Sequence, residues 1–94
     1  MKVLYARVEH PNNGYEGYKE AIEKLDHERF YEVKKVAMGQ SSTSIMLDFA
    51  EVRIWLNSSN FEFYLKDDEG KYIPHNIFSD KDYNPYLVGL RAKD

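Results

Sequence analysis

Three histidines are the side chains of this sequence most suited to acid–base or metal chemistry: His10, His27 and His75. A hydrolytic or metal site needs two or three such groups converging with carboxylates. The spacings HxH and HxxxH, which bring two histidines together within one element, do not occur. His10 and His75 each adjoin a proline and follow predicted strands, so they could still meet in space. One hypothesis is therefore a small hydrolase or metal-dependent enzyme that uses His10, His75 and Asp80 or Asp82.

Two acidic segments, DDEG at 67–70 and SDKD at 79–82, contain the oxygen ligands that calcium prefers. An EF-hand loop needs alternating oxygen ligands and a distant bidentate glutamate, and neither segment has that spacing. Aspartates in short loops more often accept hydrogen bonds from their own backbone. The sequence therefore predicts turns at both places and no bound metal.

Motifs for covalent and nucleotide chemistry are missing as well. The chain has no cysteine, which excludes thiolate catalysis, disulfides and cysteine-ligated metals. Its five glycines are dispersed and form no phosphate-binding loop, and no serine lies in a GxSxG elbow. We therefore expect no cofactor, and a non-catalytic protein is favoured over an enzyme.

Aromatic residues are the most unusual feature of the composition. Eight tyrosines, five phenylalanines and one tryptophan are too many for full burial in a 94-residue domain. Trp55 and Tyr64 fall on the wetter faces of predicted strands, and Tyr83 and Tyr86 lie in or beside loops. Tyrosine and tryptophan are enriched at binding hot spots because they combine a large rigid area with a polar group. These four residues are the predicted contact set of a protein-binding surface. The competing interpretation, favoured for most of the aromatic residues, is that the helix and the C-terminal tail cover these faces.

The same exposed rings could instead stack the bases of single-stranded nucleic acid on the sheet, with Arg53 and Lys66 beside them. The charge pattern disfavours this third hypothesis. The net charge is −3, the charges are interspersed, and no basic stripe extends beyond Lys34-Lys35. Nucleic-acid affinity depends mainly on clustered phosphate contacts, so we expect no nucleic-acid partner.

Length and composition indicate a single folded domain, residues 1–94. The sequence is 43% hydrophobic, which suffices for a core without a metal or a disulfide. The N-terminal apolar run is too short for a signal peptide, and no segment approaches the roughly 20 apolar residues of a membrane span. A cytoplasmic location without membrane contact is the expectation.

Hydrophobic periodicity predicts the first two elements. Residues 2–9 alternate as a strand with apolar groups on both faces, which is typical of an interior strand. Residues 15–28 predict one amphipathic helix. Its apolar stripe consists of Tyr18, Ala21, Ile22 and Leu25.

Alternating segments separated by polar turns follow the helix, as expected for antiparallel strands. The turns are predicted at 39–42, 48–51, 57–60 and 67–70. Gly70 can take the left-handed conformation that a bulged hairpin requires, so the last turn is the best defined. The apolar groups of residues 74–94 predict a coil with short turns that packs against the sheet.

The predicted fold is therefore α+β: a mainly antiparallel sheet of five or six strands, one amphipathic helix on one face, and an ordered C-terminal tail. The leading functional hypothesis is a non-catalytic protein-interaction module of accessory, inhibitory or immunity type, such as a bacterial mobile element encodes. The expected partner is another protein or a second copy of the chain, as a homodimer.

Overall fold

The computed structural model describes residues 2–14, 16–49 and 55–87, which form one antiparallel sheet and a short helix. The six strands are β1 (Leu4–Val8), β2 (Tyr31–Met38), β3 (Thr43–Leu47), β4 (Trp55–Asn57), β5 (Phe61–Lys66) and β6 (Tyr72–Pro74). They lie in the order β4-β3-β2-β1-β5-β6, and every neighbouring pair is antiparallel. This confirms the predicted α+β fold and the interior position of the first strand.

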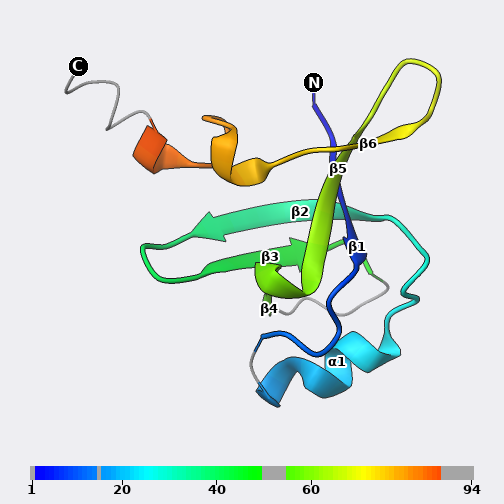
Figure 1. Ribbon diagram of the computed structural model, residues 1–94, viewed down its shortest axis with the longest axis vertical. Helices are drawn as coiled ribbons and strands as arrows, with labels where there is room; N and C mark the ends of the chain where they lie inside the picture. The colour runs from blue at the N-terminus through cyan, green and yellow to red at the C-terminus, as the bar shows by residue number, and fades with distance from the viewer. Residues whose placement is uncertain (1, 15, 50–54, 88–94) are drawn as a thin grey trace.

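The sheet bends sharply where β1 meets β2. Figure 1 shows β1 and β5 running across the direction of β2 and β3. The β1–β2 ladder is short, with Tyr5 opposite Glu32 and Ala6 opposite Tyr31. The register of β2 against β3 also shifts between Val33 and Lys35, and such a bulge increases the local twist. The bend lets one face of the sheet wrap around the core.

Alternation along the strands decides which side chains enter that core. In β1, Leu4, Ala6 and Val8 are buried while the residues between them are half-exposed. The other buried apolar strand residues are Tyr31, Ile45, Leu47, Leu56, Phe61 and Phe63. The helix adds Ile22 and Leu25, and the C-terminal segment adds Ile77, which is fully buried. In Figure 1 the helix and the C-terminal segment lie beyond opposite edges of the β2–β3 pair, and both contribute side chains to the same core.

The helix is shorter than the periodicity predicts. Instead of spanning 15–28, it consists of the 3-10 turn η1 (Glu16–Tyr18) and α1 (Lys19–Lys24). It ends because Asp26 and His27 supply alternative hydrogen bonds: the Asp26 carboxylate accepts from Glu28 N–H, and the His27 ring bonds to Ile22 O. Such local bonds compete with continuation of a helix. The predicted apolar stripe nevertheless packs on the core.

The turns largely follow the prediction. Gly70 has φ 84° in the β5–β6 hairpin, and the Asp67 carboxylate accepts from the backbone N–H groups of Glu69 and Lys71. The tail forms the 3-10 turn η3 (Ile77–Ser79) and is helical at 85–87, and it packs on the sheet through Ile77. The predicted turn at 48–51 lies partly outside the described residues.

A buried amide fixes the loop that follows β1. Asn60 is 1% exposed, and its Nδ2 donates to His10 O at 2.9 Å and to Asn13 O at 2.6 Å. Its backbone carbonyl accepts from the N–H groups of Glu9 and His10, both at 3.1 Å. Gly14 lies against it with φ 80°, and a Cβ at that position would stand 2.5 Å from Asn60 Oδ1.

The substitution Gly14→Ala is therefore expected to destabilise the protein by about 1–3 kcal/mol, because it combines a strained φ with a clash against a buried side chain. Gly17→Ala is the matched control, since a Cβ at Gly17 meets nothing within 4 Å. This control should be neutral or stabilise by up to about 1 kcal/mol. Urea unfolding of both variants measures the difference, and equal stabilities would contradict the role of Asn60.

Candidate functional site

Four aromatic side chains gather on the face of the sheet opposite the core. They are Tyr5, Phe30, Tyr64 and Tyr72, and we call them the aromatic face. Strand register brings them together, because Tyr5 pairs with Tyr64 in the β1–β5 ladder and Tyr72 pairs with Lys66 in the β5–β6 ladder. All four are half-buried. The cluster is therefore a continuous aromatic surface that still reaches solvent.

The rings of the aromatic face lie against one another. Phe30 stacks on Tyr72 with centroids 3.8 Å apart and an interplanar angle of 3°. Phe30 also meets Tyr64 edge-to-face at 4.9 Å, and Tyr5 meets Tyr72 in the same way at 5.1 Å. Each contact of this kind contributes about 0.5–1.5 kcal/mol beyond area burial, so the rings are held in place before any partner arrives.

Two cations flank the aromatic face. The Arg7 guanidinium lies 5.4 Å from the Phe30 centroid, and its Nε donates to His27 O at 3.1 Å. Lys66 Nζ lies 5.0 Å from the Tyr72 centroid and 5.6 Å from that of Tyr5. These are cation–π distances. Glu9 Oε2 lies 3.7 Å from Arg7 Nε, so the rim of the surface carries charges of both signs.

Tyr64 also has a polar anchor. Its hydroxyl donates to Glu9 Oε2 at 2.9 Å, and burial together with this bond raises the pKa of Tyr64 above its usual value. The hydroxyl therefore stays protonated at neutral pH and acts as a hydrogen-bond donor rather than as a base.

The four residues predicted as one contact set lie in separate places. Trp55 is 39% exposed in β4, at the far edge of the sheet from β6. Tyr83 is half-buried with Lys2 Nζ 5.5 Å from its ring centroid, and burial raises the pKa of Tyr83. Tyr86 is 44% exposed in the C-terminal segment. Only Tyr64 belongs to the aromatic face.

Sequence reasoning missed Tyr5, Phe30 and Tyr72. Part of the signal was present, because alternation places Tyr5 on the opposite side of its strand from Leu4 and Ala6, and the predicted hairpin sets Tyr72 near Lys66. What was missing was the pairing of β1 with β5, which joins segments more than fifty residues apart and has no local signature.

His10 and His75 line one hollow of about 940 Å³ that runs along β5, which we call the β5 hollow; Glu62, Tyr64 and Phe78 also line it. Each histidine has its own carboxylate. His10 Nε2 bonds to Glu62 Oε1 at 3.1 Å, and His75 Nε2 bonds to Asp80 Oδ2 at 2.7 Å.

The two histidines flank β5 from opposite sides. His10 N–H donates to Asn60 O, whereas His75 N–H donates to Phe63 O, three residues further along. Strand spacing and rise then place their backbones about 14 Å apart. Within the described residues, no group of three histidine, cysteine, aspartate or glutamate side chains could hold a metal ion. The hollow thus contains two separate His–carboxylate pairs.

Asp80 links Lys2, in the segment before β1, to His75, which follows β6. It is 9% exposed, and its Oδ2 accepts from Lys2 Nζ at 2.6 Å as well as from His75. Its Oδ1 accepts from Asp82 N–H at 2.9 Å. The hydrogen bond from Lys2 is the main cause that lowers the pKa of Asp80 to about 2, against the opposing effect of burial.

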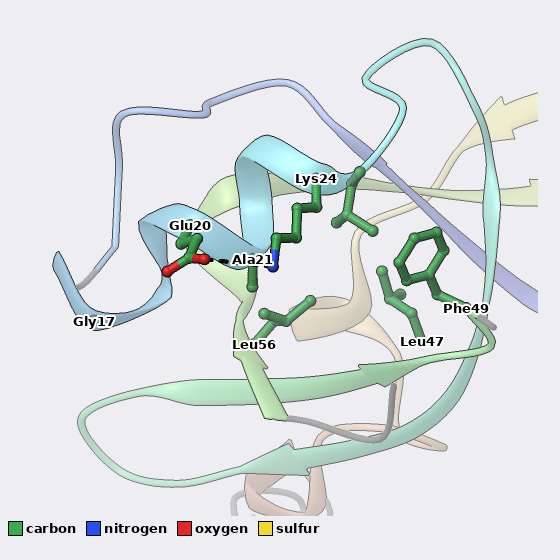
Figure 2. Close-up of a pocket in the computed structure, with 8 residues that line it drawn as sticks. Gly17, Glu20, Ala21, Lys24, Leu47, Phe49 and Leu56 are labelled. Carbon is green, nitrogen blue, oxygen red and sulfur yellow. Dashed lines mark ion pairs between the residues drawn. The ribbon is translucent and has the colours of Figure 1, made fainter. Parts of the chain in front are cut away.

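A separate pocket of about 320 Å³ lies between α1 and strands β3 and β4. Figure 2 shows Leu47, Leu56 and Phe49 on one side and α1 on the other. Glu20 and Lys24 from α1 form an ion pair at 3.3 Å beside it, as their spacing predicts. Its walls are mainly apolar, and none of the sequence-predicted site residues contributes to it.

A family model described as bacteriophage T4 protein Y07B matches residues 3–88, nearly the whole chain. The chain belongs to this phage protein family. The comparison with curated proteins finds no match, and neither does the comparison with solved structures. Among the described residues, no helix has the length and apolar character that a membrane crossing requires.

The Asp80 contacts predict a specific pH dependence. Because the folded-state pKa of about 2 lies below the ordinary value of 3.8, ionised Asp80 stabilises the fold above pH 3.8. This contribution is lost as the pH falls through about 2. Asp80→Asn should therefore cost about 1.5–3 kcal/mol at pH 7, and the difference from the wild type should shrink between pH 4 and pH 2.

Asp82→Asn is the matched control for this experiment. Its side chain is 60% exposed and its ion pair with Lys2 is at the surface, so we expect less than about 1 kcal/mol. Denaturant unfolding at several pH values measures both variants. A pH-independent loss for Asp80→Asn would contradict the electrostatic account.

Proposed function

We propose that this chain is a small, non-catalytic phage accessory protein that binds another protein through its aromatic face. The observation that carries the proposal is the half-buried cluster of Tyr5, Phe30, Tyr64 and Tyr72, flanked by Arg7 and Lys66. Aromatic and arginine side chains dominate the hot spots of protein interfaces. The chain belongs to a phage protein family, so a protein of the infected cell is the partner to test first.

Preorganisation strengthens this reading. Binding costs free energy when side chains must be ordered, at about 0.5–1.5 kcal/mol for each immobilised rotamer-rich side chain. The stacked and edge-to-face contacts already fix the orientation of Phe30 and Tyr72, and Glu9 holds the hydroxyl of Tyr64. A partner that covers these rings therefore gains area burial at a low entropic cost.

The ring contacts weigh against the nucleic-acid alternative. A base binds by stacking on a free aromatic face. Here one face of Tyr72 is stacked on Phe30, and Tyr5 and Lys66 also contact its ring. Glu9 lies 3.7 Å from Arg7, Glu62 is opposite Arg7 in the β1–β5 ladder, and Glu32 is opposite Tyr5 in the β1–β2 ladder. Carboxylates this close to the cations disfavour a phosphate backbone.

The separate histidine pairs weigh against the enzyme alternative. General acid–base catalysis requires both groups to reach one reacting centre. His10 bonds to Glu62 of β5, whereas His75 bonds to Asp80 of the C-terminal segment, so each histidine has a different carboxylate. Asp80 in particular is engaged by Lys2 and by the backbone of Asp82, which supports a structural role.

Substitution of the aromatic face should weaken partner capture. Tyr72→Ala removes the ring that Phe30 stacks on and should weaken binding about tenfold or more. Lys66→Glu reverses the charge over Tyr5 and Tyr72 without truncating a ring, and it should act in the same direction. The measurement is affinity capture from the lysate of the host bacterium, with quantitative mass spectrometry of the retained protein.

Trp55→Ala is the control for these variants, because it removes an exposed ring at the opposite edge of the sheet. It should leave capture unchanged, and thermal unfolding should show that all variants are folded. Loss of the partner with Trp55→Ala but not with Tyr72→Ala would refute the aromatic face. Capture that disappears after nuclease treatment would replace the protein partner with nucleic acid, and capture of the chain itself would indicate a homodimer.

A further inference from the structure

The β5 hollow lies along an edge of β5 that β6 leaves open. The β5–β6 register covers only Tyr64, Leu65 and Lys66. The last hydrogen bond between β5 and the chain that follows β6 runs from His75 N–H to Phe63 O at 2.8 Å. Beyond it the chain turns away through Asn76 into η3. The first half of β5 therefore has β1 on one side and the hollow on the other.

Alternation decides which backbone groups face the hollow. Glu9 N–H donates to Asn60 O, so every second residue from Asn60 onward directs its backbone groups toward β1. Phe61 and Phe63 fall between these residues. Their backbone N–H and C=O groups therefore point to the opposite edge, which is the side of the hollow.

Half of these groups are already bonded. Phe61 N–H donates to Ser58 O, and Phe63 O accepts from His75 N–H. Within the described part of the chain, neither the β1–β5 ladder, the β5–β6 ladder nor a turn supplies a backbone hydrogen bond to Phe61 O or Phe63 N–H. These two groups flank Glu62. In a parallel ladder, one residue of the added strand donates its N–H to such an acceptor and its C=O accepts from such a donor.

The side chains that line the hollow carry little charge. Glu62 is the one carboxylate among the described residues that line it and bonds to His10, while His75 bonds to Asp80. Phe78 is 48% exposed and forms part of the wall, so it offers an apolar surface next to the open backbone. A ligand of the hollow therefore gains little from charge and more from backbone hydrogen bonds and apolar contact.

We propose that the β5 hollow binds an uncharged, extended peptide segment of the partner protein by adding it to the open edge of β5. One residue of that segment donates its N–H to Phe61 O and accepts from Phe63 N–H, and a neighbouring apolar side chain packs on Phe78. This inference rests on the proposed function. Tyr64 lines the hollow and belongs to the aromatic face, so one partner can contact both.

The first test needs no partner. Amide hydrogen exchange of the free chain, read by NMR, should show fast exchange for Phe63 N–H and strong protection for the N–H groups of Tyr64 and Leu65, which lie within the ladders. Strong protection of Phe63 N–H in the free protein would mean that the edge is closed, and the inference would fail.

The second test uses a displayed library of random short peptides selected on the wild-type chain. A selected peptide should protect Phe63 N–H from exchange. N-methylation of the peptide nitrogen that donates to Phe61 O should lower its affinity at least tenfold. N-methylation of the adjacent peptide nitrogen should be tolerated. Its affinity should change little with added salt. A library without binders, or a binder that tolerates every N-methylation, would overturn the inference.

Phe78→Ala and Tyr86→Ala form the matched pair of variants, since both remove an exposed aromatic ring but only Phe78 lines the β5 hollow. Phe78→Ala should weaken the peptide at least fivefold, and Tyr86→Ala should leave it unchanged. If the lysate partner depends on Tyr72 but leaves Phe63 N–H unprotected, the proposed function stands and this inference falls. If the partner is insensitive to Tyr72→Ala and Lys66→Glu, the proposed function itself falls.

Discussion

The buried amide of Asn60 is the contact on which the arrangement of this protein depends. Its Nδ2 holds the carbonyls of His10 and Asn13, and its own carbonyl ends the β1–β5 ladder. Removing a buried donor leaves its acceptors unsatisfied, which typically costs about 1–3 kcal/mol. The amide thereby fixes where β5 begins and where the loop after β1 lies. Both features form walls of the β5 hollow, so the shape of the candidate site follows from a core interaction.

Because side chains and backbone groups alternate in direction along β5, this one strand contributes to both the aromatic face and the β5 hollow. Phe61 and Phe63 send their side chains into the core and their backbone groups toward the hollow. Tyr64 bonds to β1 through its backbone and places its ring on the aromatic face. The short β6 covers only the second half of the strand, which leaves the first half open. A side-chain surface and a backbone edge therefore lie next to each other.

Local features of the fold were predictable, and long-range ones were not. The Asp67–Gly70 hairpin follows from turn chemistry, and the interior position of the first strand follows from its two apolar faces. The length of the helix was overestimated, because hydrophobic periodicity does not reveal the hydrogen bonds of Asp26 and His27 that end it. The aromatic face depends on the pairing of β1 with β5, which no local pattern encodes. Alternation placed Trp55 on the wetter face of its strand, where it is 39% exposed, but the grouping of rings requires the sheet order.

The most direct test of the account is hydrogen–deuterium exchange of the chain, free and bound to its captured protein partner, resolved along the sequence. The account predicts reduced exchange on binding in residues 4–8, 61–66 and 72–76, with no change in residues 43–47 and 55–57. This pattern would place the partner on the aromatic face and the adjoining hollow. Protection confined to residues 55–57 and 83–87 would contradict the account and would instead support an interface around Trp55, Tyr83 and Tyr86.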